Sequence, residues 1–250
     1  MNIYELFSSI LRHKIKNMQI LKLITSLLLF NVLSIYSSPG QVGESKIKTQ
    51  IINSDSIYGS ISNSQLALEE LIQGNGRFLE GKQIHMDFKN QILQTKEDQH
   101  PHSFILSCID SRIPPEIIFD QGIGKVFVGR VAGNISDPNL LGSMEFATKI
   151  KGAKLIVIMG HNKCGSVKGA IDGAEMGNLS QLVRQIQPAI TGDRTHLDQM
   201  TTETAKNNVV MTINNILKNS KIIRELVNES RIKIVGAFYD VTSGKVSFFN

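Results

Sequence analysis

Four short apolar runs divide the second half of the chain, and each is continuous instead of alternating with polar residues. They cover residues 104–106, 126–128, 155–159 and 232–238. Continuous runs of this length are typical of strands that are buried on both faces. Helix-like stretches separate them, at 115–119, 140–150 and 166–229, the last with a break near 188–193. This alternation predicts an α/β fold with a central, mostly parallel four-stranded sheet flanked by helices.

A weaker helical pattern precedes the first strand. Asn63 or Ser64 can cap a helix in which four apolar residues fall on one face: Leu68, Leu71, Ile72 and Leu79. Gly74 and Gly76 weaken the far end of this helix. The pattern predicts an amino-terminal helical arm whose apolar stripe is a docking face.

The carboxyl end has the pattern of a hairpin. Within residues 240–249, the turn Thr242-Ser243-Gly244 predicts a reversal of the chain followed by an antiparallel edge strand. The sequence shows no internal repeat and no clear second domain. We therefore expect residues 63–250 to form a single domain.

The first 38 residues have a different pattern. Four basic residues, Arg12, Lys14, Lys16 and Lys22, precede an apolar run at 23–35, and small residues follow it. This order is typical of a secretory signal peptide, and the run is shorter than the roughly 20 residues of a membrane span. An uncleaved anchor is the alternative, and Met18 is an alternative start. We expect an exported protein, periplasmic or secreted, that is free of the membrane once residues 1–38 are removed, with 39–62 as a linker.

Composition narrows the class of protein. The chain has 41% hydrophobic and 20% charged residues, which excludes general disorder. The formal net charge is +5, and residues 1–38 hold four basic residues and one acid, so the mature charge falls to +2. No basic cluster remains that would indicate a nucleic-acid partner.

Candidate chemistry lies at two predicted strand ends. Cys108-Ile109-Asp110-Ser111-Arg112 follows the first strand, and Gly160-His161-Asn162-Lys163-Cys164-Gly165 follows the third. The carboxyl ends of parallel strands collect ligands, and these two loops face each other if the first and third strands are neighbours. Two thiolates and one imidazole suit a tetrahedral Zn²⁺ with one open position. The pattern predicts a zinc site at Cys108, His161 and Cys164.

A disulfide is the main alternative for the cysteines. The chain has 2 Cys, and for an exported protein the count and the compartment alone favour pairing them. A disulfide, however, needs neither His161 three residues before Cys164 nor Asp110 and Arg112 beside Cys108. These neighbours favour the zinc site. The absence of a Cys-x-x-Cys pair disfavours a redox protein.

On these residues the sequence resembles the β-class carbonic anhydrases, from about Asn63 to Phe248. The most specific matches are 108–112 and 160–165, with support from 74–78, 127–130 and 143–147. The resemblance implies one Zn²⁺ on Cys108, His161 and Cys164. It also implies that Asp110 either takes the fourth position or leaves it to water while paired with Arg112.

The resemblance further implies an activity, the reversible hydration of CO₂ to bicarbonate and a proton. Asp110 would orient a zinc-bound hydroxide and Arg112 would gate Asp110. Gln99, Phe127, Phe146 and the Gly165 amide would line the CO₂ pocket, in a homodimer or homotetramer. Two alternatives stay open: a hydrolase of carbonyl sulfide or carbon disulfide, and a non-enzymatic binding module stapled by zinc or a disulfide.

Two residues depart from the family pattern, and four others are interpreted as structural. Phe146 stands where plant-type members carry Tyr, and Ile105 stands where the bicarbonate-regulated bacterial subtype carries Trp, so that subtype's regulatory site is not expected. His100 and His102 are interpreted as loop residues, not metal ligands. Arg130, like Glu145, is interpreted as structural, in a buried pair or a dimer contact.

Overall fold

The computed structural model describes residues 61–249. The predicted signal peptide at 1–38 and almost all of the linker at 39–62 therefore lie outside the described residues. Among the helices at 61–249, none is long and apolar enough to cross a membrane.

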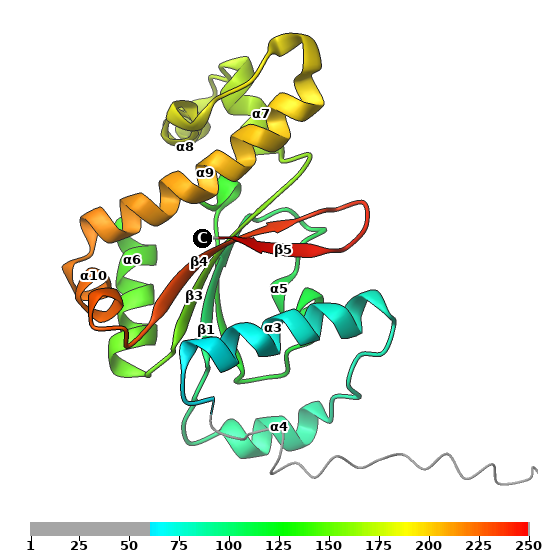
Figure 1. The fold of residues 1–250 in the computed structure, drawn as a ribbon, viewed down its shortest axis with the longest axis vertical. Helices are drawn as coiled ribbons and strands as arrows, with labels where there is room; N and C mark the ends of the chain where they lie inside the picture. The colour runs from blue at the N-terminus through cyan, green and yellow to red at the C-terminus, as the bar shows by residue number, and fades with distance from the viewer. Residues whose placement is uncertain (1–60, 250) are drawn as a thin grey trace, which may run out of the picture. The chain divides into compact units, whose positions relative to one another are not determined.

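A single five-stranded sheet forms the centre of the described part (Figure 1). Its strands are β1 (Ser103–Ser107), β2 (Val126–Arg130), β3 (Leu155–His161), β4 (Lys233–Tyr239) and β5 (Val246–Phe249). The order is β2-β1-β3-β4-β5; the first four strands are parallel, and β5 is antiparallel to β4. The predicted α/β class, the parallel four-stranded core and the antiparallel edge strand are all confirmed.

Continuous apolar runs mark the central strands because helices cover both faces of the sheet. Every residue of β1 and β3 is buried, whereas the edge strand β2 is only half-buried. Alternate residues of a strand point to opposite faces. Accordingly Ile105 and Val157 belong to the apolar core on one face, and Leu106 and Ile158 to the core on the other.

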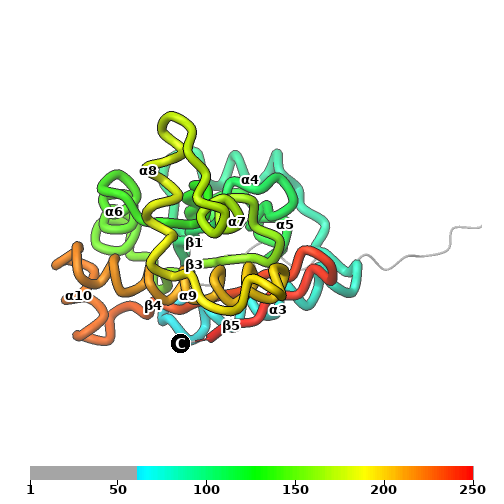
Figure 2. The backbone as a smooth tube through the Cα atoms, turned by 90° about the horizontal axis from the view of Figure 1, so that it is seen from above, coloured from blue at the N-terminus to red at the C-terminus, as the bar shows by residue number. Residues whose placement is uncertain are grey.

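Eight α-helices lie along residues 61–249. They are α3 (Ser64–Leu79), α4 (Phe88–Thr95), α5 (Pro115–Ile118), α6 (Pro138–Glu145), α7 (Gly165–Asp172), α8 (Gly177–Ile186), α9 (Leu197–Asn219) and α10 (Lys221–Asn228). Helices α3, α5, α7 and α8 supply one core and α6 and α10 the other, while the long α9 contributes to both (Figure 2).

The region 166–229 has more breaks than the sequence pattern predicts. The break expected near 188–193 is present. It starts in the short turn Gln187–Ala189 and ends before the next turn, Arg194–His196. Two further breaks separate helices: Gly173 ends α7 in the left-handed conformation, and Ser220 caps α10 with its side chain. Helix α4 is absent from the sequence prediction.

Helix α3 begins where the sequence predicts, with Asn63 as its cap: the Asn63 side chain accepts hydrogen bonds from the Gln65 and Leu66 amides. The helix continues through both glycines to Leu79, as the predicted stripe requires. A Cβ on Gly74 would lie 1.9 Å from the Phe119 carbonyl oxygen, so this glycine permits close packing. The apolar stripe is divided: Leu71 is buried, while Ile72 and Leu79 are exposed.

Asn75 fastens α3 to the rest of the domain. Its buried amide donates to the carbonyl oxygens of Ile118 and Gly244 at 3.2 and 3.0 Å. Its Oδ1 accepts from the Val246 amide at 2.9 Å. One side chain on α3 therefore contacts the end of α5 and the hairpin that leads into β5.

The sheet order places the two loops of interest side by side. Strands β1 and β3 are parallel neighbours, with Ser107 opposite Met159. Cys108 directly follows β1, and His161 is the last residue of β3. The expectation that the first and third strands are neighbours is confirmed.

Candidate metal centre

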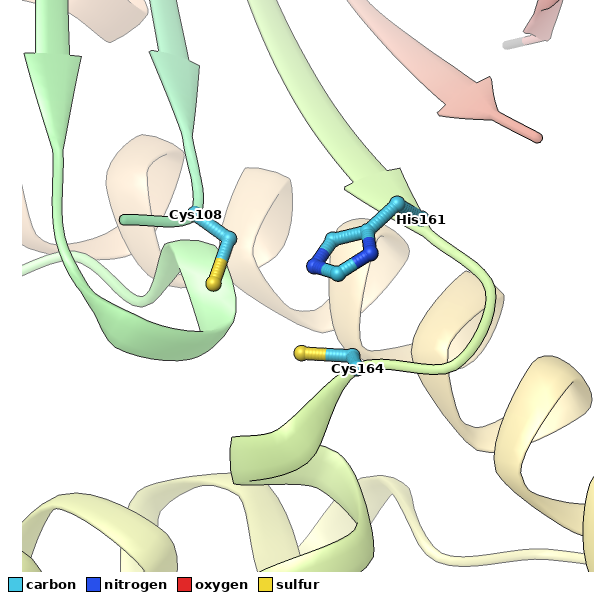
Figure 3. A group of neighbouring side chains, drawn as sticks. All are labelled: Cys108, His161 and Cys164. Atoms are coloured by element: carbon cyan, nitrogen blue, oxygen red, sulfur yellow. The ribbon is translucent and has the colours of Figure 1, made fainter. Parts of the chain in front are cut away.

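Three buried side chains converge at the carboxyl edge of the sheet (Figure 3). Cys108 extends from the end of β1, His161 from the end of β3, and Cys164 from the position that caps α7. One ligand atom from each residue lies within 4.8 Å of the others. Lys163, in the left-handed conformation with φ 52°, makes the tight turn that brings Cys164 back toward His161.

The imidazole of His161 is oriented to leave one nitrogen available. Its Nδ1 donates to the Asn162 carbonyl oxygen at 2.8 Å. Its Nε2 is fully buried and has no hydrogen-bond partner among residues 61–249. A buried polar atom without a partner costs free energy unless a ligand satisfies it. With two thiols beside it, this nitrogen completes a donor set that fits Zn²⁺.

Both cysteines are free, so the disulfide alternative is wrong for this structure. The Cys108 thiol lowers the pKa of Cys164 to about 6 by hydrogen bonding to it, and the Ser166 hydroxyl lowers it further. The same contact with Cys164 raises the pKa of Cys108 to about 12. The two thiols thus hydrogen-bond to each other, and a divalent cation held by both sulfurs would require both as thiolates.

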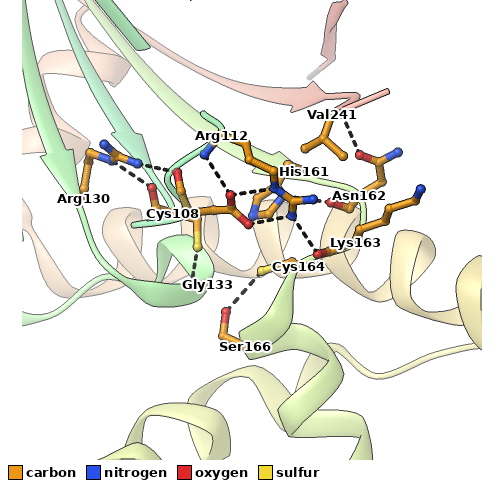
Figure 4. A network of polar contacts seen from close by, with 11 residues as sticks. Cys108, Arg112, Arg130, Gly133, His161, Asn162, Lys163, Cys164, Ser166 and Val241 are labelled. Atoms are coloured by element: carbon orange, nitrogen blue, oxygen red, sulfur yellow. Dashed lines mark hydrogen bonds and ion pairs between the residues drawn. The ribbon is translucent and has the colours of Figure 1, made fainter. Parts of the chain in front are cut away.

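Several donors surround the sulfur atoms (Figure 4). The Gly133 amide donates to Cys108 Sγ at 3.3 Å, and the Ser166 hydroxyl lies 3.1 Å from Cys164 Sγ. Cys164 also receives hydrogen bonds from the backbone amides of Ser166 and Val167, in the first turn of α7. A helix N-terminus stabilises negative charge, so this position favours a thiolate at Cys164.

Asp110 and Arg112 form an ion pair beside the cysteines. Arg112 Nε donates to Oδ1 of Asp110 at 2.9 Å, and Arg112 Nη2 donates to Oδ2 at 2.7 Å. The Arg112 amide adds a third bond to Oδ1 at 3.0 Å. Arg112 lowers the pKa of Asp110 to about 2 through these bonds, so the carboxylate is ionised at neutral pH.

Arg112 also connects the two loops, since its Nη2 donates to the Lys163 carbonyl oxygen at 3.3 Å. Asn162 anchors the second loop: its Nδ2 donates to Asp240 at 2.8 Å, and its Oδ1 accepts from the Val241 amide at 2.8 Å. The loop that carries His161 and Cys164 is thereby tied to the turn after β4.

Arg130, at the end of β2, supports the first loop. Its Nε donates to the Cys108 carbonyl oxygen at 3.0 Å, and its Nη2 donates to the Asp110 carbonyl oxygen at 2.6 Å. The sequence interpretation places Arg130 in a buried pair or a dimer contact, but Arg130 is exposed and these two partners are backbone carbonyls. Glu145 likewise accepts from the Ser220 hydroxyl at 2.6 Å, which joins α6 to α10.

The four expected pocket residues do not all gather at this edge. Gly165 begins α7 beside Cys164. Phe127, however, pairs with Phe104 near the start of β1, four residues and roughly 13 Å of strand before Cys108. Phe146 packs edge-on against Phe127, with ring centroids 6.3 Å apart, and Gln99 precedes β1. Within one chain, these last three residues lie toward the opposite end of the strands.

The sequence pattern missed most of the groups that surround the ligands. Gly133, Ser166 and Asn162 had no assigned role, although each bonds a ligand or a ligand loop. Ser166 could have been recognised from sequence, because its hydroxyl lies two residues after Cys164, at the start of a predicted helix. Nothing in the sequence indicated that Gly133 contacts Cys108, because 25 residues separate them.

A buried site of two thiols and one imidazole, at the topological switch point of a parallel sheet, defines a class of protein: an α/β metalloenzyme with a zinc-type centre. Comparison with known proteins agrees. Residues 103–246 match the family described as carbonic anhydrase. Carbonic anhydrase 2 of Mycobacterium tuberculosis is 32% identical over 194 residues, covering 74% of this chain and 92% of that protein.

Solved structures give the same result. A β-carbonic anhydrase of Aspergillus fumigatus, CafA, has a TM-score of 0.59 at 26% identity and covers 65% of this chain and 81% of its own. A chain from the crystal structures of two tetrameric β-carbonic anhydrases of Sordaria macrospora has a TM-score of 0.57 at 26% identity, and the match covers 65% of this chain and 90% of that chain. The chain belongs to the carbonic anhydrase family, in its β class. It is a carbonate dehydratase that hydrates CO₂, and its cofactor is zinc.

Proposed function

We propose that the enzyme hydrates CO₂ at this edge of the sheet, with zinc held by Cys108, His161 and Cys164. The observation that carries the assignment is the convergence of three buried side chains, whose ligand atoms lie within 4.8 Å of one another. The Nε2 atom of His161 has no hydrogen-bond partner in the described region. Two thiolates and an imidazole are ligands that zinc prefers. When bound, the ion supplies the Lewis acidity that makes water a nucleophile near neutral pH.

The ligand assignment is tested by counting zinc and measuring stopped-flow CO₂ hydration on the same samples. Cys164→Ser is expected to reduce zinc from about one ion per chain to a small fraction of that value and to abolish activity. His196→Ala, in the exposed turn Arg194–His196, is the control and should keep both. A Cys164→Ser protein with full zinc content would refute the assignment.

Asp110 is assigned the orienting role in this reaction. Its carboxylate is ionised, so it accepts a hydrogen bond from the attacking oxygen and directs that oxygen's lone pair at the carbon of CO₂. Arg112 binds both carboxylate oxygens and so keeps Asp110 from taking a ligand position itself. Loss of this restraint would favour Asp110 as a fourth metal ligand, which is an inactive arrangement.

The amide of Gly165 is at the first position of α7. We assign it the role of donating a hydrogen bond to the oxygen on which negative charge develops as bicarbonate forms. Helix N-termini stabilise anions through unpaired amides and the helix dipole.

The remaining pocket residues are assigned to a second copy of the chain. Gln99, Phe127 and Phe146 lie toward the far end of the strands from the cysteines in their own chain, so they can reach a metal centre only in trans. Phe146 is 45% exposed, and the neighbouring Ile150 is 68% exposed. Large apolar side chains in such positions indicate a surface that another chain covers. We therefore propose a homodimer, or a tetramer built from such dimers.

Mixing two inactive variants tests the proposal. One variant, Cys164→Ser, lacks a ligand, and the other, Phe127→Ala, lacks a pocket wall. If the pocket forms between chains, each mixed dimer contains one intact site, and exchange of subunits restores about a quarter of the wild-type activity. If the pocket forms within one chain, no mixed dimer has an intact site, and no recovery would contradict the proposal.

We also propose that the protein is exported after removal of residues 1–38. The support is the order of basic, apolar and small residues in that segment, which lies outside the described residues. The intact mass of the protein isolated from its native compartment tests this proposal. A mass that corresponds to a start at Met1 or Met18 would contradict it.

A further inference from the structure

A short turn closes the metal centre on the Cys108 side. The turn Ala132–Asn134 presents the Gly133 amide to Cys108 Sγ at 3.3 Å. Gly133 and Asn134 both have positive φ, 70° and 43°, a conformation that needs support from its surroundings. A Cβ on Gly133 would lie 2.4 Å from Ile186 Cδ1, so the turn is also tightly packed from the side of α8.

The long helix α9 supplies that support. Asn208, which is fully buried on α9, donates from Nδ2 to the Gly133 carbonyl oxygen at 2.7 Å. The helix lies directly against β3: a Cβ on Gly160 would be 2.7 Å from Val209 Cγ2 and 3.3 Å from the Ala205 carbonyl oxygen. This close packing fixes Asn208 relative to the strand that ends in His161.

Asn208 lowers the stability of the fold more than a purely structural residue at this position needs to. Its Oδ1 is buried and has no hydrogen-bond partner in the described part of the chain. Burying a polar atom that remains unpaired destabilises a fold, and an apolar side chain of similar size would avoid that cost. An exception to the usual rules of core composition is expected where a residue serves the functional site.

We propose that Asn208 is a positioning residue of the metal centre. By holding the Gly133 carbonyl group, it keeps the adjoining Gly133 amide directed at Cys108 Sγ. An amide that donates to a thiolate stabilises the charged form and orients the sulfur for the metal. Asn208 contacts neither metal nor substrate and acts only through Gly133 and Cys108. This inference rests on the proposed role of Cys108 as a zinc ligand.

The test compares Asn208→Leu with Thr212→Val. Thr212 is buried one helical turn further along the same face of α9, so its variant controls for changed helix packing. Zinc affinity is measured by competition with a chromophoric chelator, and the thiolate-to-metal absorption band is recorded on cobalt-substituted protein. Asn208→Leu is expected to weaken zinc binding about tenfold and to shift the band, while Thr212→Val changes neither. An unchanged affinity and band in Asn208→Leu would overturn the proposal.

A second measurement does not depend on the folding of a variant. In wild-type protein loaded with a spin-half cadmium isotope, the Gly133 amide proton is expected to show scalar coupling to the metal across its hydrogen bond to Cys108 Sγ. An amide proton without that coupling would contradict the proposal.

The two proposals fail in different ways. If Cys108→Ser binds zinc as tightly as the wild type, the ligand assignment is wrong. If Cys108→Ser loses zinc but Asn208→Leu binds it normally, only the role of Asn208 is wrong.

Discussion

At the scale of single residues, the site depends on partners that fix charge and direction. Arg112 holds the Asp110 carboxylate through both of its oxygens. The Asn162 carbonyl group fixes Nδ1 of His161 and leaves Nε2 for a metal. Each functional atom is oriented by a neighbour that does not itself react, as expected for a preorganised centre.

Removing the Arg112 guanidinium should separate zinc binding from catalysis. Arg112→Ala is expected to keep about one zinc per chain while CO₂ hydration falls by roughly a hundredfold, because Asp110 loses the restraint that holds it in place. Stopped-flow hydration and zinc content are measured on the same sample. Arg231→Ala, which removes an arginine from an exposed pair with Glu229, should be fully active. Full activity in Arg112→Ala would eliminate the gating role.

The three residues that converge at the site could be predicted from sequence, and their surroundings could not. His161 and Cys164 are three residues apart, so one turn supplies both, and local spacing reveals them. Gly133 contacts Cys108 from 25 residues away along the chain, and Asn208 contacts Gly133 from 75 residues away. Contacts of this kind depend on how the helices dock, and no local pattern records them.

At the scale of elements, some glycines are needed because a neighbouring element packs so closely that no side chain would fit. In α3, Gly74 faces the Phe119 carbonyl oxygen, whereas a Cβ on Gly76 would meet nothing within 4 Å. The two glycines have the same helix propensity and lie two residues apart, but only the first is required for packing.

These glycines give opposite predictions for stability. Gly74→Ala places a methyl group against backbone atoms and is expected to lower the free energy of unfolding by about 3 kcal/mol. Gly76→Ala should raise it by about 0.5–1 kcal/mol, because alanine loses less backbone entropy in a helix. Denaturant unfolding of both zinc-loaded variants provides the measurement. Equal effects would show that α3 does not pack on Phe119 as described.

Strands were easier to predict than helices, for a physical reason. The runs in β1 and β3 are apolar throughout because both faces of the sheet are covered. Helix α4 has the sequence FKNQILQT, in which Phe88, Ile92 and Leu93 are all exposed, so it has no buried stripe to recognise.

At the scale of the whole molecule, folding and metal binding are linked. The three proposed ligands come from the ends of two strands and the start of a helix, and they meet only when the sheet is complete. A metal that binds the folded state alone stabilises it in proportion to the logarithm of its concentration over Kd.

Zinc removal should therefore lower global stability. At a free zinc concentration of roughly a thousand times Kd, bound zinc contributes about 4 kcal/mol, which a chelator removes. Thermal unfolding with and without chelator measures the effect. Cys108→Ser serves as the control, since its melting temperature should not respond to the chelator. An identical response in both proteins would place the stabilising metal elsewhere.

The acid stability of the fold should depend on His102, which is buried at the amino end of β1. It lies 2.7 Å from the Ser103 hydroxyl and 3.1 Å from Gln121 Oε1. Burial lowers the pKa of His102 below its ordinary value of 6.5; the charge of Glu70 opposes this shift and that of Lys125 adds to it. Below about pH 6.5 the unfolded chain therefore binds more protons than the folded protein does, so the free energy of unfolding decreases as pH falls.

His102→Asn removes the titrating ring. Between about pH 7.5 and pH 5.5, its free energy of unfolding is expected to fall less than that of the wild type, although it starts lower. Denaturant unfolding at both pH values measures the difference. Equal losses in the two proteins would show that His102 does not couple protonation to folding.

The three bonds of Asn75 also have a consequence for biosynthesis. The residue belongs to the first described helix, yet two of its partners, Gly244 and Val246, lie 169 and 171 residues later. A ribosome releases the chain from its amino end, so α3 emerges before either of these residues. Its contacts with Ile118 and Phe119 become available much earlier than its bonds to the hairpin. The docking of α3 is thus completed late, when the last described strand closes over the first described helix.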